Sequence, residues 1–420
     1  MAGGENVTAK RYKVLMIAPT SFFADYGCHV RILEEARVLN RLGHQVVVCT
    51  YRNGQDVPGL DIRRTRSIPF RRRYQVGSSP HKIAFDFLLF WKALAIALRW
   101  RPDVIHGHLH EGALLGSAVG RLLGIPLVFD FQGSMTSEMI DHRFLARDSV
   151  FYRPLYWLET RIDRAAPAVI TSSRHALNLL VTRFGCRPER VHTVADCVDS
   201  DAFYPLAGDE RASLDRRRAE LGIPPGRRVV VYLGLLAPYQ GTDLLLQAVT
   251  LLRHQVEDVH FLIMGYPAVD HYRSLAHRLG VADCTTFTGR VPYGQARDFL
   301  ALGDVAVAPK LSDTEGSGKI LDYMAMGLPT VAFDTPVSRE YLGDQSIFAA
   351  QVDAPSLAQA LIRGLHEAGA DGRRRANLRR IAVERYSWAQ AADTILHAYR
   401  SVCPDTRGRA AALKAGGVEG

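Results

Sequence analysis

The chain has 420 residues, of which 47% are hydrophobic and 23% charged, proportions typical of a folded globular protein with about two domains. Its net charge of +9 favours anionic partners such as nucleotide sugars, nucleic acid or a membrane surface. The start MAGGENVTAKRYK lacks an apolar core, no uncharged run reaches membrane-spanning length, and the six cysteines are scattered without a C-x-x-C pair, so the sequence predicts a reduced cytoplasmic protein without a signal peptide, spanning helix or structural zinc.

The first elements alternate between strand and helix. Residues 13–18 (KVLMIA) predict a buried strand, and a helix from about Cys28 to Leu42 and a second strand, QVVVCT, follow. This alternation predicts a doubly wound parallel sheet, in which ligands bind at the carboxyl ends of strands. Gly27, just ahead of the first helix, lies at such an end and is a candidate phosphate contact. A glycine needed only for the turn is the alternative.

A basic run precedes a very apolar segment. Six arginines fall between Arg63 and Arg73, and IAFDFLLFWKALAIALRW begins ten residues later. One interpretation is a basic, apolar edge that docks on an anionic membrane or a lipid-linked acceptor. The other is a core helix beside a solvated charge run, which is favoured because Asp86 and Lys92 are compatible with a helix that buries one side.

Three histidines alternate at the end of the next predicted strand, DVIH. His106, His108 and His110 would share one face if the strand continued. A metal site is not predicted, because no further paired ligand is evident. We expect these histidines to line a cleft, where they would hydrogen-bond sugar hydroxyls or phosphate.

Polar residues also follow the next predicted strand, which contains Asp130 and leads to Gln132. The loop beyond it carries Glu138 and His142, and we expect this loop to meet an acceptor. Residues 1–203 are predicted to form a first domain, residues 204–227 a charged linker and residues 228–385 a second domain. A helix at 386–402 and a disordered tail at 403–420 complete the predicted organisation.

The most informative stretch of the second domain runs from Pro309 to Val331. It predicts a strand end, a small polar loop and a short helix from about Ser317 to Met326. The backbone N–H groups at Gly316, Ser317 and Gly318, together with the helix dipole, predict a phosphate site. Glu315 and Asp322 lie seven residues apart, so both can face one cleft, and a carboxylate there suits a sugar diol. An ordinary strand-to-helix turn is the alternative.

The end of this stretch, Y-M-A-M-G-L-P at residues 323–329, resembles the nucleotide-sugar motif of family 4 retaining glycosyltransferases. That motif carries two glutamates separated by seven residues. Aligned from the tail, the second glutamate corresponds to Asp322, which the resemblance implies binds the ribose. The first falls on Thr314, and Glu315 takes its place, as a contact to the donor sugar, only if one residue is deleted.

The resemblance spans roughly residues 12–402 and implies the GT-B architecture, an α/β fold of two Rossmann-like, doubly wound parallel-sheet domains facing a central cleft. The first domain would bind the acceptor and the second the nucleotide sugar, while the helix at 386–402 packs back on the first domain. Gln132 stands where the family often has a histidine close to the reacting carbon. Asp130 and His108 are implied to share that catalytic task.

The sequence departs from the family at the diphosphate. The segment from Gly234 to Gly241 aligns with a family segment whose arginine and lysine hold the donor diphosphate, and those two positions here are Leu235 and Gln240. We predict that Gly234 still contacts the donor. Arg290 and Lys319 are predicted to offset the diphosphate charge, because each flanks a predicted cleft loop.

The resemblance therefore implies a hexosyltransferase that moves a sugar with retention from a nucleotide-diphosphate sugar, by family default a UDP-sugar, to the hydroxyl of a small-molecule, glycan or lipid-linked acceptor, with neither metal nor bound cofactor. A sugar-nucleotide epimerase or hydrolase of the same fold and a non-catalytic nucleotide-sugar-binding protein are the alternatives. Nucleic-acid binding is not predicted, because neither a stacking-aromatic nor a helix-turn-helix pattern is evident. The expected location is the cytoplasm, with membrane association through residues 63–73 left open.

Overall fold

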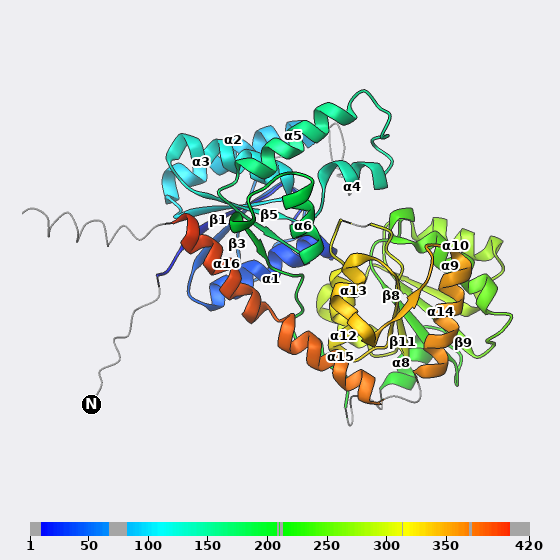
Figure 1. The fold of residues 1–420 in the computed structure, drawn as a ribbon. Coiled ribbons are helices and arrows are strands. Elements are labelled where there is room, and N and C mark those ends of the chain that lie inside the picture. Colours follow the sequence, from blue (N-terminus) through cyan, green and yellow to red (C-terminus); the bar gives the residue numbers. More distant parts are fainter. Residues whose placement is uncertain are drawn as a thin grey trace, which may run out of the picture.

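A computed structural model describes residues 10–66, 82–207, 210, 213–312, 314–368 and 372–403. The chain forms two lobes, each built around a parallel sheet covered by helices (Figure 1). Side chains from both faces of each sheet are buried, so every lobe has two core layers. The predicted pair of Rossmann-like domains is confirmed.

The N-terminal lobe contains a seven-stranded sheet of order β3-β2-β1-β4-β5-β6-β7. In strand β1, Val14 and Met16 pack into one core layer, whereas Leu15 and Ile17 pack into the other. This two-sided burial explains the continuous apolar runs in the sequence. The strands are β1 (Lys13–Ala18), β2 (Gln45–Thr50), β3 (Asp61–Arg64), β4 (Val104–His108), β5 (Leu127–Phe131), β6 (Ala168–Thr171) and β7 (Val191–Thr193).

The helices of this lobe lie on both faces of the sheet (Figure 1). The apolar segment after the basic run forms one long helix that buries one side, including Phe85 and Leu89, and exposes Phe87 and Trp91 on the other. No described helix is both long and apolar enough to cross a membrane. The helices are α1 (Gly27–Arg41), α2 (Lys82–Trp100), α3 (Leu109–Leu123), α4 (Met135–Asp141), α5 (Tyr152–Ala165) and α6 (Arg174–Thr182).

The C-terminal lobe contains a six-stranded sheet of order β10-β9-β8-β11-β12-β13. Its strands are β8 (Arg228–Leu233), β9 (Val259–Met264), β10 (Thr285–Gly289), β11 (Val305–Ala308), β12 (Thr330–Phe333) and β13 (Ile347–Ala349). Its helices are α8 (Leu214–Glu220), α9 (Thr242–Leu252), α10 (Val269–Arg278), α11 (Ala296–Leu300), α12 (Gly318–Ala325), α13 (Pro336–Leu342), α14 (Ala354–Glu367) and α15 (Gly372–Arg385). Both sheets reverse their strand order beside the first strand of the lobe, β1 or β8, and ligands bind at such reversals.

The last described helix, α16 (Trp388–Val402), runs from the C-terminal lobe back to the N-terminal lobe (Figure 1). Ile395 and Tyr399 join the core layer that contains Val14. The chain therefore crosses between the lobes twice. The predicted tail beyond Cys403 and the predicted contacts at Arg71–Arg73 lie outside the described residues.

Candidate active site

A cavity of about 280 Å³ lies between the lobes, at the point where both sheets reverse their strand order. Its wall includes residues that follow β1, β5, β8 and β11. Of the predicted site residues, the cavity brings together Gly27, Gln132, Gly234, Glu315, Gly316, Ser317, Gly318, Lys319 and Asp322. Three predicted site residues do not line it: His108, Asp130 and Arg290.

The predicted phosphate loop leads into α12, whose N-terminus faces this cavity. The Ser317 side chain makes no capping hydrogen bond, and its hydroxyl has no hydrogen-bond partner among the described residues. A Cβ atom at Gly316 would lie 2.1 Å from the Asp196 Oδ2 atom, so only glycine fits there. The helix therefore presents uncapped N–H groups to the cavity, which is an arrangement suited to an anion.

Lys319, in the first turn of α12, brings a positive charge to the same place. Its Nζ donates a hydrogen bond to the Gln240 side-chain oxygen at 3.0 Å and lies 4.5 Å from the centre of the Tyr232 ring. Among the described residues it forms no ion pair with a carboxylate. Burial and, to a smaller extent, nearby Lys310 lower the pKa of Lys319 to about 7.

Gly234 makes room for this lysine. A Cβ atom there would lie 2.6 Å from the Lys319 Nζ, and the residue has a φ of +154°. Gln240, which occupies the position of the family lysine, receives the hydrogen bond from Lys319. The Lys319 amino group of the neighbouring helix thus lies beside the position where the family has a lysine.

Asp322 lies one turn further along α12 and is partly buried in the cavity wall. Its side chain makes no hydrogen bond or ion pair with another described side chain. Burial raises its pKa well above the usual range, and the nearby carboxyl groups of Asp196 and Glu34 raise it further. Asp322 is therefore a hydrogen-bonding group whose partner is not supplied by the described residues.

Glu315 lies where the two lobes touch. Its Oε2 pairs with the Lys310 Nζ at 2.7 Å, and the same amino group donates to the Gly316 carbonyl at 2.6 Å. A Cβ atom at Gly133 of the N-terminal lobe would lie 2.7 Å from the Glu315 Cγ. Close packing of the lobes at this point therefore requires glycine.

Behind the N-terminal wall lies a buried charge network centred on Arg31 of α1. Its Nη2 donates to Asp130 at 2.9 Å and its Nη1 donates to Asp196 at 3.2 Å. Gln132 Nε2 also donates to Asp130, at 2.7 Å. Burial alone would raise the pKa of Asp130, but Arg31 and the hydrogen bond with His108 outweigh it and hold the pKa well below the usual range. Asp130 thus positions Gln132 from behind.

The expectation that the histidines line the cleft is wrong. Strand β4 ends at His108, and α3 begins at Leu109, so His110 belongs to a helix. All three side chains are buried. The His106 and His108 rings stack at 4.4 Å, His108 Nδ1 lies 3.0 Å from Asp130, and His106 Nδ1 lies 2.7 Å from the Tyr399 hydroxyl.

Carboxylates that the sequence did not reveal lie beside these histidines. Two groups have ligand atoms within 4.8 Å of one another, namely Glu35, His106, His108 and Asp130 in one and His110, Glu159 and Asp163 in the other. In the first group, Arg31 already lies 3.2 Å from Glu35 and 2.9 Å from Asp130. The arginine thus supplies the positive charge that these carboxylates need.

Arg290, a predicted donor ligand, forms an ion pair with Asp25 of the N-terminal lobe instead. Its Nε lies 2.7 Å from the Asp25 Oδ2, and Asp25 Oδ1 also accepts the backbone N–H of Tyr293 at 2.8 Å. Two described arginines of the basic run are also paired, Arg63 with Asp61 and Arg64 with Asp56, whereas Arg66 is exposed. The pairing of Arg290 joins segments that are 265 residues apart in the chain, whereas the other two pairs are local.

Arg31 and Asp196 are site residues that sequence reasoning missed. Arg31 and Glu35 are four residues apart on a helix, and both are buried. Charges on the buried face of a predicted helix were the available signal, because a buried charge needs a partner. Lys82 and Tyr239 also line the cavity, and no local pattern indicated them.

Comparisons with known proteins agree with this arrangement. The sequence profile described as Glycosyltransferase Family 4 matches residues 27–202, and the one described as Glycosyl transferases group 1 matches residues 227–367. D-inositol 3-phosphate glycosyltransferase from Segniliparus rotundus is 27% identical over 391 residues, covering 89% of this chain and 84% of that protein. D-inositol 3-phosphate glycosyltransferase 1 from Catenulispora acidiphila is 26% identical over 418 residues, covering 91% and 92%.

Solved structures show the same fold at low sequence identity. Sucrose-phosphate synthase from Thermosynechococcus elongatus has a TM-score of 0.76 at 17% identity, covering 93% of this chain and 98% of that chain. Anabaena HepE in complex with UDP-glucose has a TM-score of 0.74 at 15% identity, covering 93% and 100%. The two matching profiles span most of the chain, and each covers one of the two lobes that form the cavity. The protein is therefore a glycosyltransferase of family 4, group 1, with the GT-B fold.

Proposed function

We propose that this glycosyltransferase transfers a sugar from a UDP-sugar to an acceptor hydroxyl, with retention of anomeric configuration and without a metal ion. One observation carries the proposal. A lysine that forms no ion pair among the described residues, Lys319, lies at the uncapped N-terminus of α12 in the interdomain cavity, and Asp322 follows one turn later. A diphosphate and its attached ribose need these two groups in this order.

The diphosphate is the leaving group, and negative charge grows on it as the bond to the sugar breaks. Lys319 and the N–H groups at the start of α12 line the cavity, and preorganised groups of this kind stabilise developing charge strongly where they are buried, as Lys319 is. Binding of the diphosphate raises the pKa of Lys319 and keeps its amino group protonated. Asp322 accepts hydrogen bonds from the ribose hydroxyl groups.

Transfer breaks the bond between the anomeric carbon and the diphosphate oxygen and forms a bond from the same carbon to the acceptor oxygen. In this family-based mechanism the acceptor attacks on the leaving-group side, and its proton passes to the departing diphosphate. Gln132 and Glu315 line the cavity between the lobes and are the proposed contacts to the reacting sugar. Asp130 and His108 act as positioning residues behind Gln132.

A peripheral membrane contact remains part of the proposal, but the structure favours the exposed apolar face of α2 over the basic run as the contact surface. Arg63 and Arg64 pair within the N-terminal lobe, whereas α2 exposes Ile83, Phe87 and Trp91. Sedimentation with anionic vesicles should fall when Phe87 and Trp91 are both replaced by serine. Unchanged sedimentation would show that the exposed face of α2 does not bind the membrane.

The donor assignment is tested by thermal-shift titration with UDP-, GDP- and ADP-sugars. We expect one nucleotide series, UDP, to stabilise the wild type. Lys319→Met should weaken donor binding at least tenfold, because a charge-assisted hydrogen bond contributes about 1.5–3 kcal/mol. Asp322→Ala should abolish most of the shift.

Lys92→Met, on the outward helix α2, is the matched control and should bind like the wild type. Unchanged donor binding in both cavity variants would refute the site. The anomeric configuration of the product, read by NMR, tests retention, and activity in the presence of a chelator tests independence from metal.

A further inference from the structure

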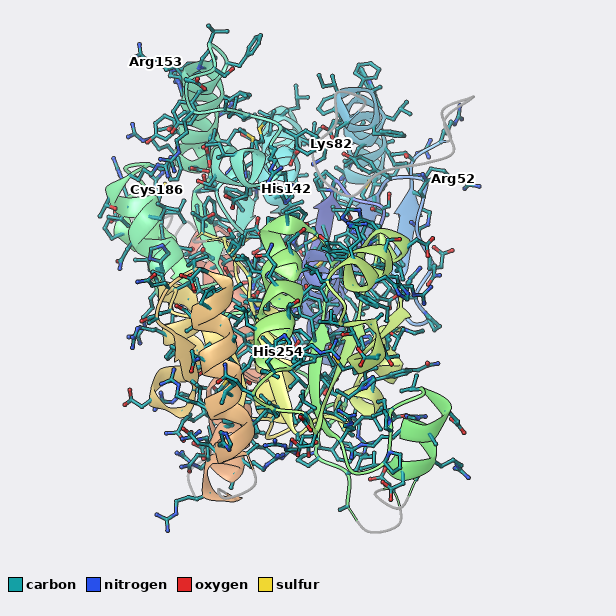
Figure 2. All side chains as sticks on the ribbon, turned by 90° about the vertical axis from the view of Figure 1, so that its right-hand side faces the viewer. Arg52, Lys82, His142, Arg153, Cys186 and His254 are labelled. Atoms are coloured by element: carbon teal, nitrogen blue, oxygen red, sulfur yellow. The ribbon has the colours of Figure 1, made fainter. Side chains whose placement is uncertain are left out.

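The N-terminal part of the cavity has an uneven charge balance. Lys82, at the start of α2, forms an ion pair with Glu111, and Lys310 pairs with Glu315 at 2.7 Å. Both lysines line the cavity, and each already has one glutamate. In Figure 2, His142 lies closer to the C-terminal lobe than Lys82 does.

Glu138 of α4 lines the same region and forms no ion pair with a lysine or arginine among the described residues. Its side chain is 34% exposed, and the Nδ1 of His142 lies 3.9 Å from the Glu138 Oε1. Burial lowers the pKa of His142, so the imidazole is neutral near pH 7. Among the described residues, the Glu138 carboxyl group is therefore left without a lysine or arginine partner once Lys82 and Lys310 are paired.

A second group in this region also lacks a partner. The His142 side chain is only 10% exposed, and its Nε2 has no hydrogen bond among the described residues. The ring packs against Tyr239 of the C-terminal lobe with ring centres 4.0 Å apart, so its position depends on both lobes. The Glu138 side chain therefore lines the cavity beside an imidazole that the C-terminal lobe holds in place.

We propose that the acceptor is a polyhydroxylated amine, an amino sugar or aminocyclitol, whose ammonium group binds Glu138 while a neighbouring hydroxyl faces the donor sugar. The inference rests on the proposed function and names its substrate class. An ammonium group supplies the missing cation and donates hydrogen bonds to both oxygens of a carboxylate. A phosphorylated acceptor would instead bring its negative charges close to Glu138, Glu315 and Glu111.

The charges around Glu138 make this preference dependent on pH. Burial and, to a smaller extent, the nearby Glu315 carboxyl group raise the pKa of Glu138 to about 7. The groups facing it are Glu315, Lys82, Glu111, His110 and His142. Since an ammonium group binds the ionised carboxylate, affinity for an amine should rise between pH 6 and pH 8, while a neutral polyol should show no such rise.

The test compares acceptors that differ in one group. Binding of glucosamine, glucose and glucose 6-phosphate, and of scyllo-inosamine, scyllo-inositol and an inositol phosphate, is measured by calorimetry with and without saturating UDP. We expect each amine to bind at least tenfold more tightly than its neutral counterpart, and each phosphate to bind more weakly than that counterpart. Glu138→Gln should remove the advantage of the amine and its rise with pH.

Glu189→Gln, at an exposed glutamate of the same lobe, is the matched control and should keep the amine preference. Absence of amine binding, equal affinity for amine and neutral compound, tightest binding of a phosphate, or a preference that survives in Glu138→Gln would each overturn the proposal. UDP binding is measured in the same experiment. If UDP binds and the amine preference is absent, only the acceptor assignment fails, whereas absence of UDP binding refutes the donor site.

Discussion

Lys319 shows how one residue can take over a task from another part of the chain. The family places a lysine at the position of Gln240, whereas here the Lys319 amino group lies 3.0 Å from the Gln240 side-chain oxygen. Glycine at position 234 leaves the space for it. In the proposed donor site, the charge that this loop lacks would be offset by Lys319 on the adjacent helix.

The pKa of Lys319 predicts how donor binding depends on pH. Burial lowers this pKa to about 7 in the free protein, and a bound diphosphate raises it. Protonated Lys319 binds the donor, so affinity should be highest below pH 7 and fall as pH rises, by up to tenfold per pH unit. Calorimetry with a UDP-sugar from pH 6 to pH 9 measures this slope.

Lys319→Arg is the control, because a guanidinium stays charged throughout this range. The variant should bind with a flatter pH profile. Asp322, whose pKa is raised by burial and then by Asp196, titrates in both proteins and therefore cancels in the comparison. Identical slopes in the two proteins would show that Lys319 does not bind the diphosphate.

At the scale of elements, α16 is tied to the N-terminal lobe by a specific polar contact. The Tyr399 hydroxyl lies 2.7 Å from His106 Nδ1, and both side chains are fully buried. Burial lowers the pKa of His106 well below its usual range, so the imidazole is neutral and needs this hydrogen bond. The contact joins α16 to β4, a central strand of the N-terminal lobe.

Removing the Tyr399 hydroxyl should therefore destabilise the N-terminal lobe. We expect Tyr399→Phe to lower its free energy of unfolding by about 1–3 kcal/mol, because a buried polar atom loses its partner. Urea unfolding combined with hydrogen exchange at β4 and α16 measures the effect for this lobe separately, since two lobes need not unfold together. Ser401→Ala, at an exposed position of the same helix, is the control, and equal stability of the two variants would refute the role of this hydrogen bond.

At the scale of the whole molecule, polar contacts hold the lobes in a closed arrangement around the cavity. Arg290 pairs with Asp25 across the cleft, and Glu340 of α13 accepts the backbone N–H of Arg174 at the start of α6, at 2.9 Å. His142 packs on Tyr239. Both lobes supply walls of the candidate active site. These contacts therefore influence the fraction of molecules in which the lobes lie close enough together to form it.

Breaking the Arg290 contact should open the molecule. Asp25→Ala removes the ion pair and the acceptor for the Tyr293 N–H, which together contribute about 1 kcal/mol, or roughly a fivefold shift toward the open form. We expect a larger radius of gyration in X-ray scattering without donor and a higher KM for the donor. Asp61→Ala, which breaks a similar pair within one lobe, should change neither. If Arg290 is instead a donor ligand held back by Asp25, the same variant will bind the donor more tightly.

The repeating strands and helices, the two sheets and the α12 site could be predicted from the sequence. Hydrophobic periodicity, helix ends and the helix dipole act within a few residues, so Gly316–Asp322 could be interpreted as a phosphate and sugar site from one short segment. The two successive runs of alternating elements likewise predicted two parallel sheets, because a parallel pair needs a crossover between its strands.

Only the tertiary structure determined which distant charges meet. The Arg31 and Asp130 side chains are 99 residues apart in the chain, and the His106 and Tyr399 side chains are 293 residues apart. The pairing of Arg290 with Asp25, the burial of the histidines and the lack of a lysine or arginine partner for Glu138 among the described residues all depend on such long-range packing. Ion pairs and burial depend on distances in the folded molecule, which no local pattern encodes, so the candidate donor segment could be predicted from the sequence, whereas the proposed acceptor contacts required the fold.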